Sequence, residues 1–330
     1  MVKIEIDDAV RSFALIYRQR AMVACNDVEK DLANLGTFVA DNNDWNDKRA
    51  IKDYINLLIA DYPKVLSLEP IEWKQYIDKY NEVLKREPDM LTTEVAYSKT
   101  KKKVLKGKLY ERIIICLQYA KARVILGEIH QQMGLKTCVY CNAIPTMSNN
   151  GEVFYQMDHY LPQSLYPFLG TCFYNLQPSC GVCNDHKKTQ DCDFGLYVNS
   201  EQHKELSPFR FVPKIESLDG PYPRCEEILL RGKGANVTKE SQAHEEMFHI
   251  NNLYAGYKDK VSKLYAKGYK LNDSVVKYMS EAFGLKPSPS DILAYLSDEI
   301  SLKENDIHKE PLTKLKQDTI KQMHDGGVID

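Results

Sequence analysis

Two Cys-x-x-Cys pairs bracket the stretch of sequence that decides the fold. The first is Cys-Val-Tyr-Cys at residues 138–141, and the second opens Cys-Gly-Val-Cys-Asn-Asp-His-Lys-Lys at residues 180–188. A two-residue gap lets each pair form a knuckle, and four thiolates bind Zn2+ tetrahedrally. The spacing therefore predicts a structural zinc site whose ligands are Cys138, Cys141, Cys180 and Cys183.

The residues between the two pairs contain the candidate chemistry. A short β-like run at 153–157 leads directly to Asp158 and His159. Adjacent residues on a regular strand face opposite sides of it, so both side chains can serve one site only where the strand ends. Asn175 precedes the second pair, and the chain can enter a helix after Cys183.

The order of these residues carries a resemblance to a known family. Asp-His at 158–159, Asn-Leu at 175–176 and Cys-x-x-Cys-Asn-x-x-Lys at 180–187 resemble the HNH, or ββα-metal, endonuclease family with a zinc-bound core. The resemblance implies that two strands and a helix hold one catalytic divalent cation, for which oxygen ligands favour Mg2+ or Mn2+. It also implies that His159 is the general base, that Asp158 and Asn184 bind that cation, and that Asn175 supports the loop that orients the histidine.

Helix geometry favours Asn184 over the nearby His186 as the cation ligand. At about 100° per residue, Asn184, Lys187 and Lys188 share one face, whereas His186 is rotated by about 200° from Asn184. We therefore expect Asn184 to bind the cation and Lys187 or Lys188 to contact a nucleic-acid phosphate. A solvated surface lysine is the alternative for each of the two lysines.

A second basic segment lies at residues 99–108 and contains Lys101, Lys102 and Lys103. These lysines can line a nucleic-acid groove or form a solvated surface, and the sequence leaves both interpretations open. The formal net charge of −2 is unusual for a DNA-binding protein that acts alone, so it favours delivery to the nucleic acid by a partner.

The flanking sequence extends the resemblance. The runs at 134–142, 158–164 and 311–315 are similar to bacterial HNH proteins of antiphage defence, with Septu-type systems as the nearest. This resemblance implies a partner ATPase. A single site of this type cuts one strand at a time, so double-strand cleavage needs two subunits or two events, and a homodimer is expected from that chemistry.

Composition and periodicity set the expected fold class. With 330 residues, 43% of them hydrophobic and 27% charged, the chain is long enough for two or three folded units. We expect an α+β fold that is mostly α. Its centre is a ββα-metal nuclease core with structural zinc at 134–230, and this region includes the strands expected near 206–213 and 225–230. Helical regions at 1–133 and 231–330 flank the core. The absence of a membrane-length apolar run and of a signal-peptide core predicts a cytoplasmic protein that does not contact membranes.

Three functions remain open at this point. The leading prediction is a metal-dependent endonuclease that hydrolyses DNA phosphodiester bonds. An RNA or tRNA nuclease on the same scaffold is the first alternative, because the metal and the base act on the phosphate and not on the identity of the base. The second alternative is a non-catalytic zinc module that binds nucleic acid or a partner, although the Asp158-His159 pair favours catalysis.

Overall fold

The computed structural model describes residues 1–97, 105–199, 205–216, 223–270, 273–284, 288, 295–296 and 301–329. The fold is α+β and mostly helical, which confirms the predicted class. Among these residues, every sheet is a two-stranded pair. None of the described helices combines the length and the apolar character needed to cross a bilayer.

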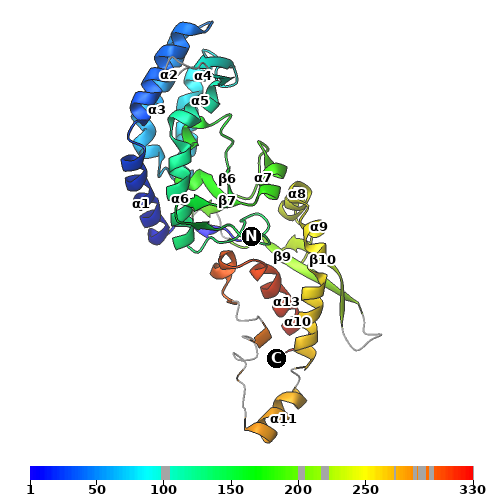
Figure 1. The fold of residues 1–330 in the computed structure, drawn as a ribbon. Coiled ribbons are helices and arrows are strands. Elements are labelled where there is room, and N and C mark those ends of the chain that lie inside the picture. The colour runs from blue at the N-terminus through cyan, green and yellow to red at the C-terminus, as the bar shows by residue number, and fades with distance from the viewer. Residues whose placement is uncertain are drawn as a thin grey trace. The chain divides into compact units, whose positions relative to one another are not determined.

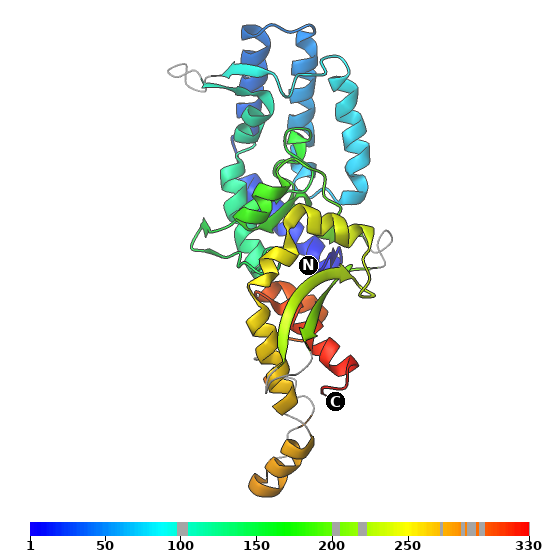
Figure 2. The same cartoon turned by 90° about the vertical axis from the view of Figure 1, so that its right-hand side faces the viewer.

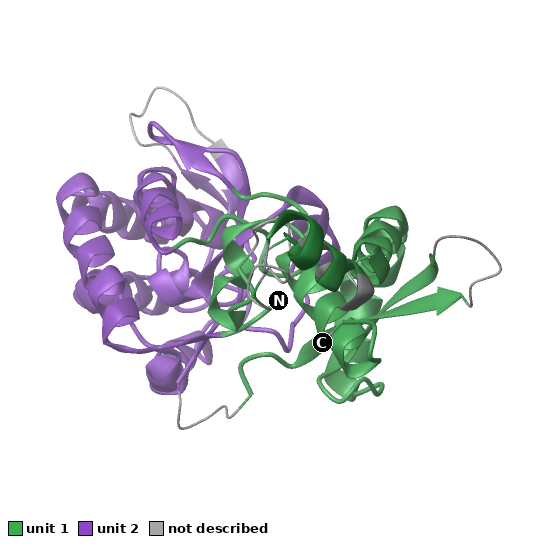
Figure 3. Ribbon diagram, turned by 90° about the horizontal axis from the view of Figure 1, so that it is seen from below, with its two compact units in different colours: residues 1–3, 134–146, 205–330 green, residues 4–133, 147–204 purple. Residues whose placement is uncertain are grey.

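The chain divides into two compact units, which Figure 3 colours separately. Unit 1 comprises Met1–Lys3, Gly134–Thr146 and Glu205–Asp330, and unit 2 comprises Ile4–Met133 and Met147–Lys204. Both units are discontinuous in sequence, so they do not coincide with the three consecutive regions predicted above. One reason is backbone pairing in unit 1, where the N–H of Lys136 donates to the carbonyl of His308 at 2.9 Å.

Helices form most of unit 2 (Figure 1). Their bounds are α1 Asp8–Ala24, α2 Val28–Asn42, α3 Lys48–Val65, α4 Trp73–Leu84, α5 Leu109–Cys116 and α6 Tyr119–Gln132. Two of them begin at aspartate caps: an Asp7 oxygen accepts from the N–H of Val10 and an Asp47 oxygen from that of Arg49, both at 2.8 Å. These side chains satisfy N–H groups that have no partner within the helix. Helix α1 packs on α6, and α3 packs on both α2 and α4.

The strands of unit 2 are short. The pairs are β1 (Ile4–Glu5) with β8 (Tyr197–Val198), β2 (Glu94–Tyr97) with β3 (Leu105–Lys108), β4 (Ser148–Asn149) with β5 (Glu152–Val153), and β6 (Gln156–His159) with β7 (Leu176–Ser179). Only the β1–β8 pair is parallel. Asn150 and Gly151 join β4 to β5 with φ values of 49° and 80°, a conformation typical of an Asn-Gly hairpin turn. Helix α7 (Gly181–Lys187) begins two residues after β7.

Unit 1 is built around one antiparallel ribbon, β9 (Phe209–Glu216) with β10 (Arg224–Gly232), which Figure 2 shows beside α10. These strands confirm the two β-runs predicted downstream of the cysteines. The helices are α8 Lys239–Phe248, α9 Ile250–Ala255, α10 Lys258–Lys270, α11 Asp273–Phe283 and α13 Thr313–Asp325. Helices α8, α9 and α10 pack on β10, whereas α13 packs on β9.

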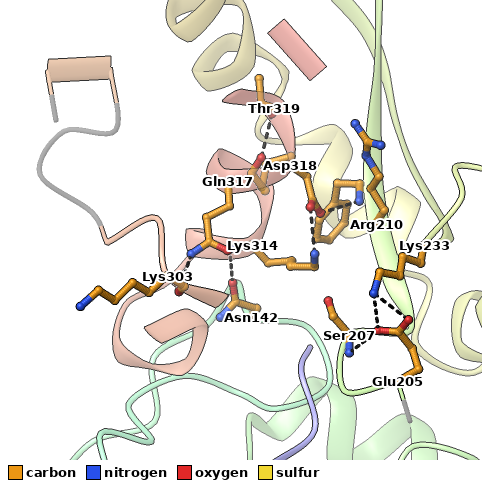
Figure 4. A network of polar contacts seen from close by, with 12 residues as sticks. Asn142, Glu205, Ser207, Arg210, Lys233, Lys303, Lys314, Gln317, Asp318 and Thr319 are labelled. Carbon is orange, nitrogen blue, oxygen red and sulfur yellow. Dashed lines mark hydrogen bonds and ion pairs between the residues drawn. The ribbon is translucent and has the colours of Figure 1, made fainter. Parts of the chain in front are cut away.

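A buried ion pair fixes α13 within unit 1 (Figure 4). The ammonium of Lys314 donates to the carboxylate of Asp318 at 2.8 Å, and both side chains are 7% exposed. Asp318 also accepts from the N–H of Phe211 on β9 at 2.8 Å. The N–H of Lys314 donates to the side-chain oxygen of Asn142 at 2.9 Å. The two buried charges are thus paired, and the carboxylate has a further hydrogen bond, as burial of charge requires.

Candidate functional site

The four predicted zinc ligands come together. The sulfur atoms of Cys138, Cys141, Cys180 and Cys183 all lie within 4.8 Å of one another, and all four residues are buried. Four sulfurs bound to one Zn2+ at about 2.3 Å would lie about 3.8 Å apart, so the cluster is close to that geometry. The cysteines can therefore hold a structural metal such as zinc.

Local hydrogen bonds shape each knuckle. The N–H of Ala143 lies 3.5 Å from the sulfur of Cys141, and the N–H of Cys183 lies 3.5 Å from that of Cys180. Amide donors of this kind stabilise a thiolate, because hydrogen bonds to the charged form favour it. Asn142 adopts a φ of 54° directly after the first pair, a left-handed conformation that asparagine tolerates better than most residues. The two-residue spacing thus leads to a backbone turn around the sulfurs.

The β6–β7 hairpin positions Asp158 and His159. Asp158 lies opposite Gln177 and His159 opposite Leu176 in the antiparallel register. We expected Asp158 and His159 at the end of a strand, and they are the last two residues of β6, although this strand begins at Gln156 and not at Val153. The reason is that β7 supplies backbone partners only from Gln156 onward. The chain then leaves the strand, and helix α7 packs against β6.

His159 has a specific tautomer and a low pKa. Its Nε2 lies 3.0 Å from the carbonyl oxygen of Gly170. A carbonyl only accepts, so Nε2 carries the proton and the neutral ring has its lone pair on Nδ1. Burial lowers the pKa of His159 to about 4, the hydrogen bond to Gly170 opposes this shift, and the charge of Lys187 adds to it. The imidazole is therefore neutral at pH 7, and Nδ1 can accept a proton.

Asn175 holds the loop that follows His159. It is fully buried, and its side-chain oxygen accepts from the N–H of Leu161 at 2.8 Å. Its side-chain nitrogen donates to the carbonyls of Leu161 and Leu169, both at 3.2 Å. Leu169 precedes Gly170, whose carbonyl bonds His159. These contacts are the ones that the predicted supporting role requires, and that role in catalysis stays a prediction.

Asp158 forms a buried ion pair with Lys187. The ammonium of Lys187 lies 3.1 and 3.3 Å from the two carboxylate oxygens, and the side chains are 0% and 3% exposed for the lysine and the aspartate. Lys187 also donates to the carbonyl of His159 at 2.9 Å. Of the two lysines expected to contact a phosphate, Lys187 is therefore buried, and that contact stays a prediction for the exposed Lys188. The physical reason is that the shared helix face turns toward β6, where a buried carboxylate needs a cation.

The ion pair leads to a prediction for Lys187→Met. We expect this variant to lose about 3–5 kcal/mol of unfolding free energy, because it removes the cation that pairs with the buried carboxylate of Asp158. Chemical denaturation of the zinc-loaded protein measures the loss. Lys188→Met is the matched control, since Lys188 is exposed and its truncation should change stability by less than about 0.5 kcal/mol. Equal stability of the two variants would contradict a structural role for the pair.

The other predicted residues in and after α7 differ in how exposed they are and in which face of the helix they lie on. Asn184 is half-buried and lies one turn before Lys187, on the face that turns toward β6. Lys188 follows the helix with a φ of 49°, and its N–H donates to the carbonyl of Asn184 at 2.9 Å. Lys188 is exposed but, contrary to expectation, does not continue the helix face that contains Asn184. His186 is half-buried.

Lys101, Lys102 and Lys103 lie outside the described residues, so their predicted role in nucleic-acid binding stays a prediction. Tyr119, at the start of α6, places its ring centroid 5.4 Å from the imidazole of His159. Sequence reasoning missed this contact, since no local pattern links Tyr119 to a residue so far along the chain.

Comparison with known proteins yields no relative, because no protein-family model, curated protein or solved structure matches the chain. A functional assignment must therefore rest on the residues of the site. The β6–β7 hairpin carries a neutral imidazole and, at the residue before it, a carboxylate, while α7, which packs against β6, carries the side-chain amide of Asn184. Chemically, these side chains offer one proton acceptor, the imidazole, and two kinds of oxygen ligand, a carboxylate and an amide.

Proposed function

We propose that the chain is a metal-dependent HNH endonuclease that hydrolyses DNA phosphodiester bonds. The observation that carries this proposal is the orientation of His159, whose Nε2 donates to the carbonyl of Gly170 and leaves Nδ1 as the proton acceptor. A general base must be unprotonated at the working pH and held in one orientation, and His159 meets both conditions. The order β6, β7, α7, with Asp158 beside the base, supports a ββα-metal type of core.

The catalytic cation in this proposal is Mg2+ or Mn2+, and its ligands are Asp158 and Asn184. Their carboxylate and amide oxygens fit such hard cations. The contacts of 3.1 and 3.3 Å between Asp158 and Lys187 are longer than the roughly 2.7–2.9 Å of short charge-assisted bonds. In this proposal the cation would share the carboxylate of Asp158 with the ammonium of Lys187. When bound, the cation would neutralise charge on the phosphate and stabilise the leaving oxygen.

The chain's own residues supply the proton transfer. Nδ1 of His159 takes the proton of the attacking water, while the carbonyl of Gly170 keeps Nε2–H in place. Asn175 fixes the loop that carries this carbonyl through its bond to Leu169. The base is thus oriented by backbone that is itself hydrogen-bonded, and little reorganisation is needed when the water is deprotonated.

The biological part of the proposal is an effector role in bacterial antiphage defence with a partner ATPase. It is supported by the resemblance of the runs at 134–142, 158–164 and 311–315, and by the net charge of −2, which favours delivery by a partner. A cytoplasmic location and a homodimer belong to the same proposal. The structural metal is proposed to be Zn2+.

A substrate panel tests the proposed activity. The zinc-loaded full chain is incubated with supercoiled plasmid, single-stranded DNA and tRNA in the presence of Mg2+, Mn2+ or EDTA. We expect plasmid cleavage with either divalent ion and none with EDTA. Preferential cleavage of tRNA would instead identify an RNA nuclease. No cleavage of any substrate, with the partner ATPase present or absent, would leave a zinc module that only binds.

Asn184→Ala tests the proposed cation ligand. We expect Mn2+ to bind at least about tenfold more weakly, since even residues that only orient a ligand contribute about that much to metal affinity. Electron paramagnetic resonance of free Mn2+ measures binding directly, and cleavage is followed against Mn2+ concentration. The control is Asp185→Ala, because Asp185 is exposed on the adjacent position of the helix. A stronger effect from Asp185→Ala would refute the assignment of Asn184.

A further inference from the structure

A pocket in unit 1 has charge of only one sign around an apolar floor. It lies between α10 and α13 and has a volume of about 220 Å³. Its floor consists of the aliphatic side chains of Val261, Leu264, Leu312 and Leu315, together with Thr319, whose hydroxyl donates to the carbonyl of Leu315 at 2.8 Å. Its rim carries the cationic residues Lys260, Lys263, Lys267 and Lys316. Within the described part of the chain, no carboxylate lines this pocket.

The floor of the pocket is preformed. Val261 and Leu315 are 2% and 1% exposed, so they are held by packing on both helices. Leu312 adopts a φ of 65° at the start of α13, and its N–H donates to the carbonyl of Asn142 at 2.7 Å. The Lys314–Asp318 pair then fixes the other face of α13 (Figure 4). A ligand would therefore meet a surface that is already ordered, which lowers the entropic cost of binding.

The rim offers cations that a ligand can reach. Lys260 and Lys263 are exposed, and neither forms an ion pair with any residue that the structure describes. Lys267 lies with its ammonium 5.0 Å from the ring centroid of Tyr295. The pocket also opens at the first turns of α13, where the helix dipole is positive. All of these charges attract an anionic ligand.

The combination of floor and rim decides which anion fits. Lysine stems are apolar and add to the aliphatic walls, while their ammonium groups remain at the rim. A nucleic-acid backbone would engage the ammonium groups but would bury its charged phosphates over a floor whose hydroxyl, that of Thr319, already donates to the carbonyl of Leu315. A peptide with one apolar side chain between carboxylates would instead fill the floor and pair with the rim. We propose that this pocket docks an acidic segment of a partner protein through a single apolar anchor residue.

Fluorescence anisotropy with defined peptides tests the proposal, using the zinc-loaded full chain. The probes are fluorescein-labelled octapeptides with three acidic residues on each side of a central pair, which is Leu-Ser, Phe-Ser, Met-Ser or, as the control, Ser-Ser. We expect at least one apolar member to bind about tenfold more tightly than the Ser-Ser peptide, because burial of one large apolar side chain contributes at least that factor. We also expect binding to weaken with added salt.

Charge reversal locates the binding site. Lys260→Glu/Lys263→Glu should weaken peptide binding by about tenfold or more. The matched control is Lys239→Glu/Lys321→Glu, which changes two exposed lysines of the same unit that do not line this pocket. Both double variants change the net charge equally, and circular dichroism checks their folding. The peptide proposal is wrong if no apolar member outperforms Ser-Ser, if both double variants weaken binding equally, or if a labelled single-stranded oligonucleotide outcompetes every peptide at these lysines.

Discussion

Replacement of His159 by alanine is expected to reduce DNA cleavage by about 10²- to 10⁴-fold, the contribution that a positioned general base makes. The reason lies in the tautomer: with Nε2 bonded to Gly170, the unprotonated Nδ1 is the proton acceptor that the side chain offers. Plasmid cleavage at saturating Mg2+ measures the loss. His159 is half-buried at the end of β6, so its truncation should leave the hairpin and the cysteine cluster in place.

His186→Ala is the matched control for this experiment. Both histidines are half-buried and lie near the same helix, but only His159 has the orientation expected of the base. We expect His186→Ala to keep cleavage within about threefold of the original chain, the factor that roughly 0.7 kcal/mol corresponds to. Zinc content and circular dichroism confirm that both variants are folded. Full cleavage by folded His159→Ala protein would eliminate the proposed mechanism.

Replacement of Cys180 by serine is expected to remove the structural metal and unfold the surrounding chain. Structural Zn2+ sites contribute apparent binding free energies of about 10–16 kcal/mol, as large as the whole stability of a typical domain at about 5–15 kcal/mol. The four sulfurs are buried within 4.8 Å of one another, so without an ion their thiolates repel one another. Zinc analysis by mass spectrometry and thermal unfolding measure the two effects, and strong chelators should reproduce them.

Cys225→Ser provides the control for the zinc prediction. Cys225 is a buried free thiol on β10, outside the four-cysteine cluster. Its replacement changes one buried sulfur to oxygen and should cost about 1–3 kcal/mol without loss of zinc, because the hydroxyl is a buried polar group. If Cys180→Ser kept a full equivalent of zinc and the original unfolding temperature, the cluster would not be the metal site.

The extent of prediction from sequence differs between the parts of this protein. The spacing of the cysteines predicted their meeting, because four ligands of one metal must converge whatever fold surrounds them. The strands β9 and β10 were also predicted, since their apolar pattern and turn residues are local properties. The start of β6 at Gln156 was not, because strand length depends on the partner β7 and not on the residues of β6 alone.

Lys187 shows most clearly that the sequence can predict the helix face on which a residue lies but not the environment of that face. Its spacing from Asn184 predicted a shared helix face, which the structure contains. What that face meets could not be predicted from spacing, and it meets the carboxylate of Asp158 in a buried ion pair. A lysine is more often solvated, so the local pattern favoured the wrong environment.

The sequence by itself determined the inventory of the candidate site: four thiols in two pairs, an Asp-His step at 158–159, and the amides Asn175 and Asn184. Tertiary structure alone decided the discontinuous units, the burial of Lys187 and the bond from His159 to Gly170 that selects its tautomer. The physical reason is how far apart along the chain the interacting residues lie. Ligand spacing and periodicity act between residues close along the chain, whereas burial, pKa and hydrogen-bond partners depend on segments that only folding brings into contact.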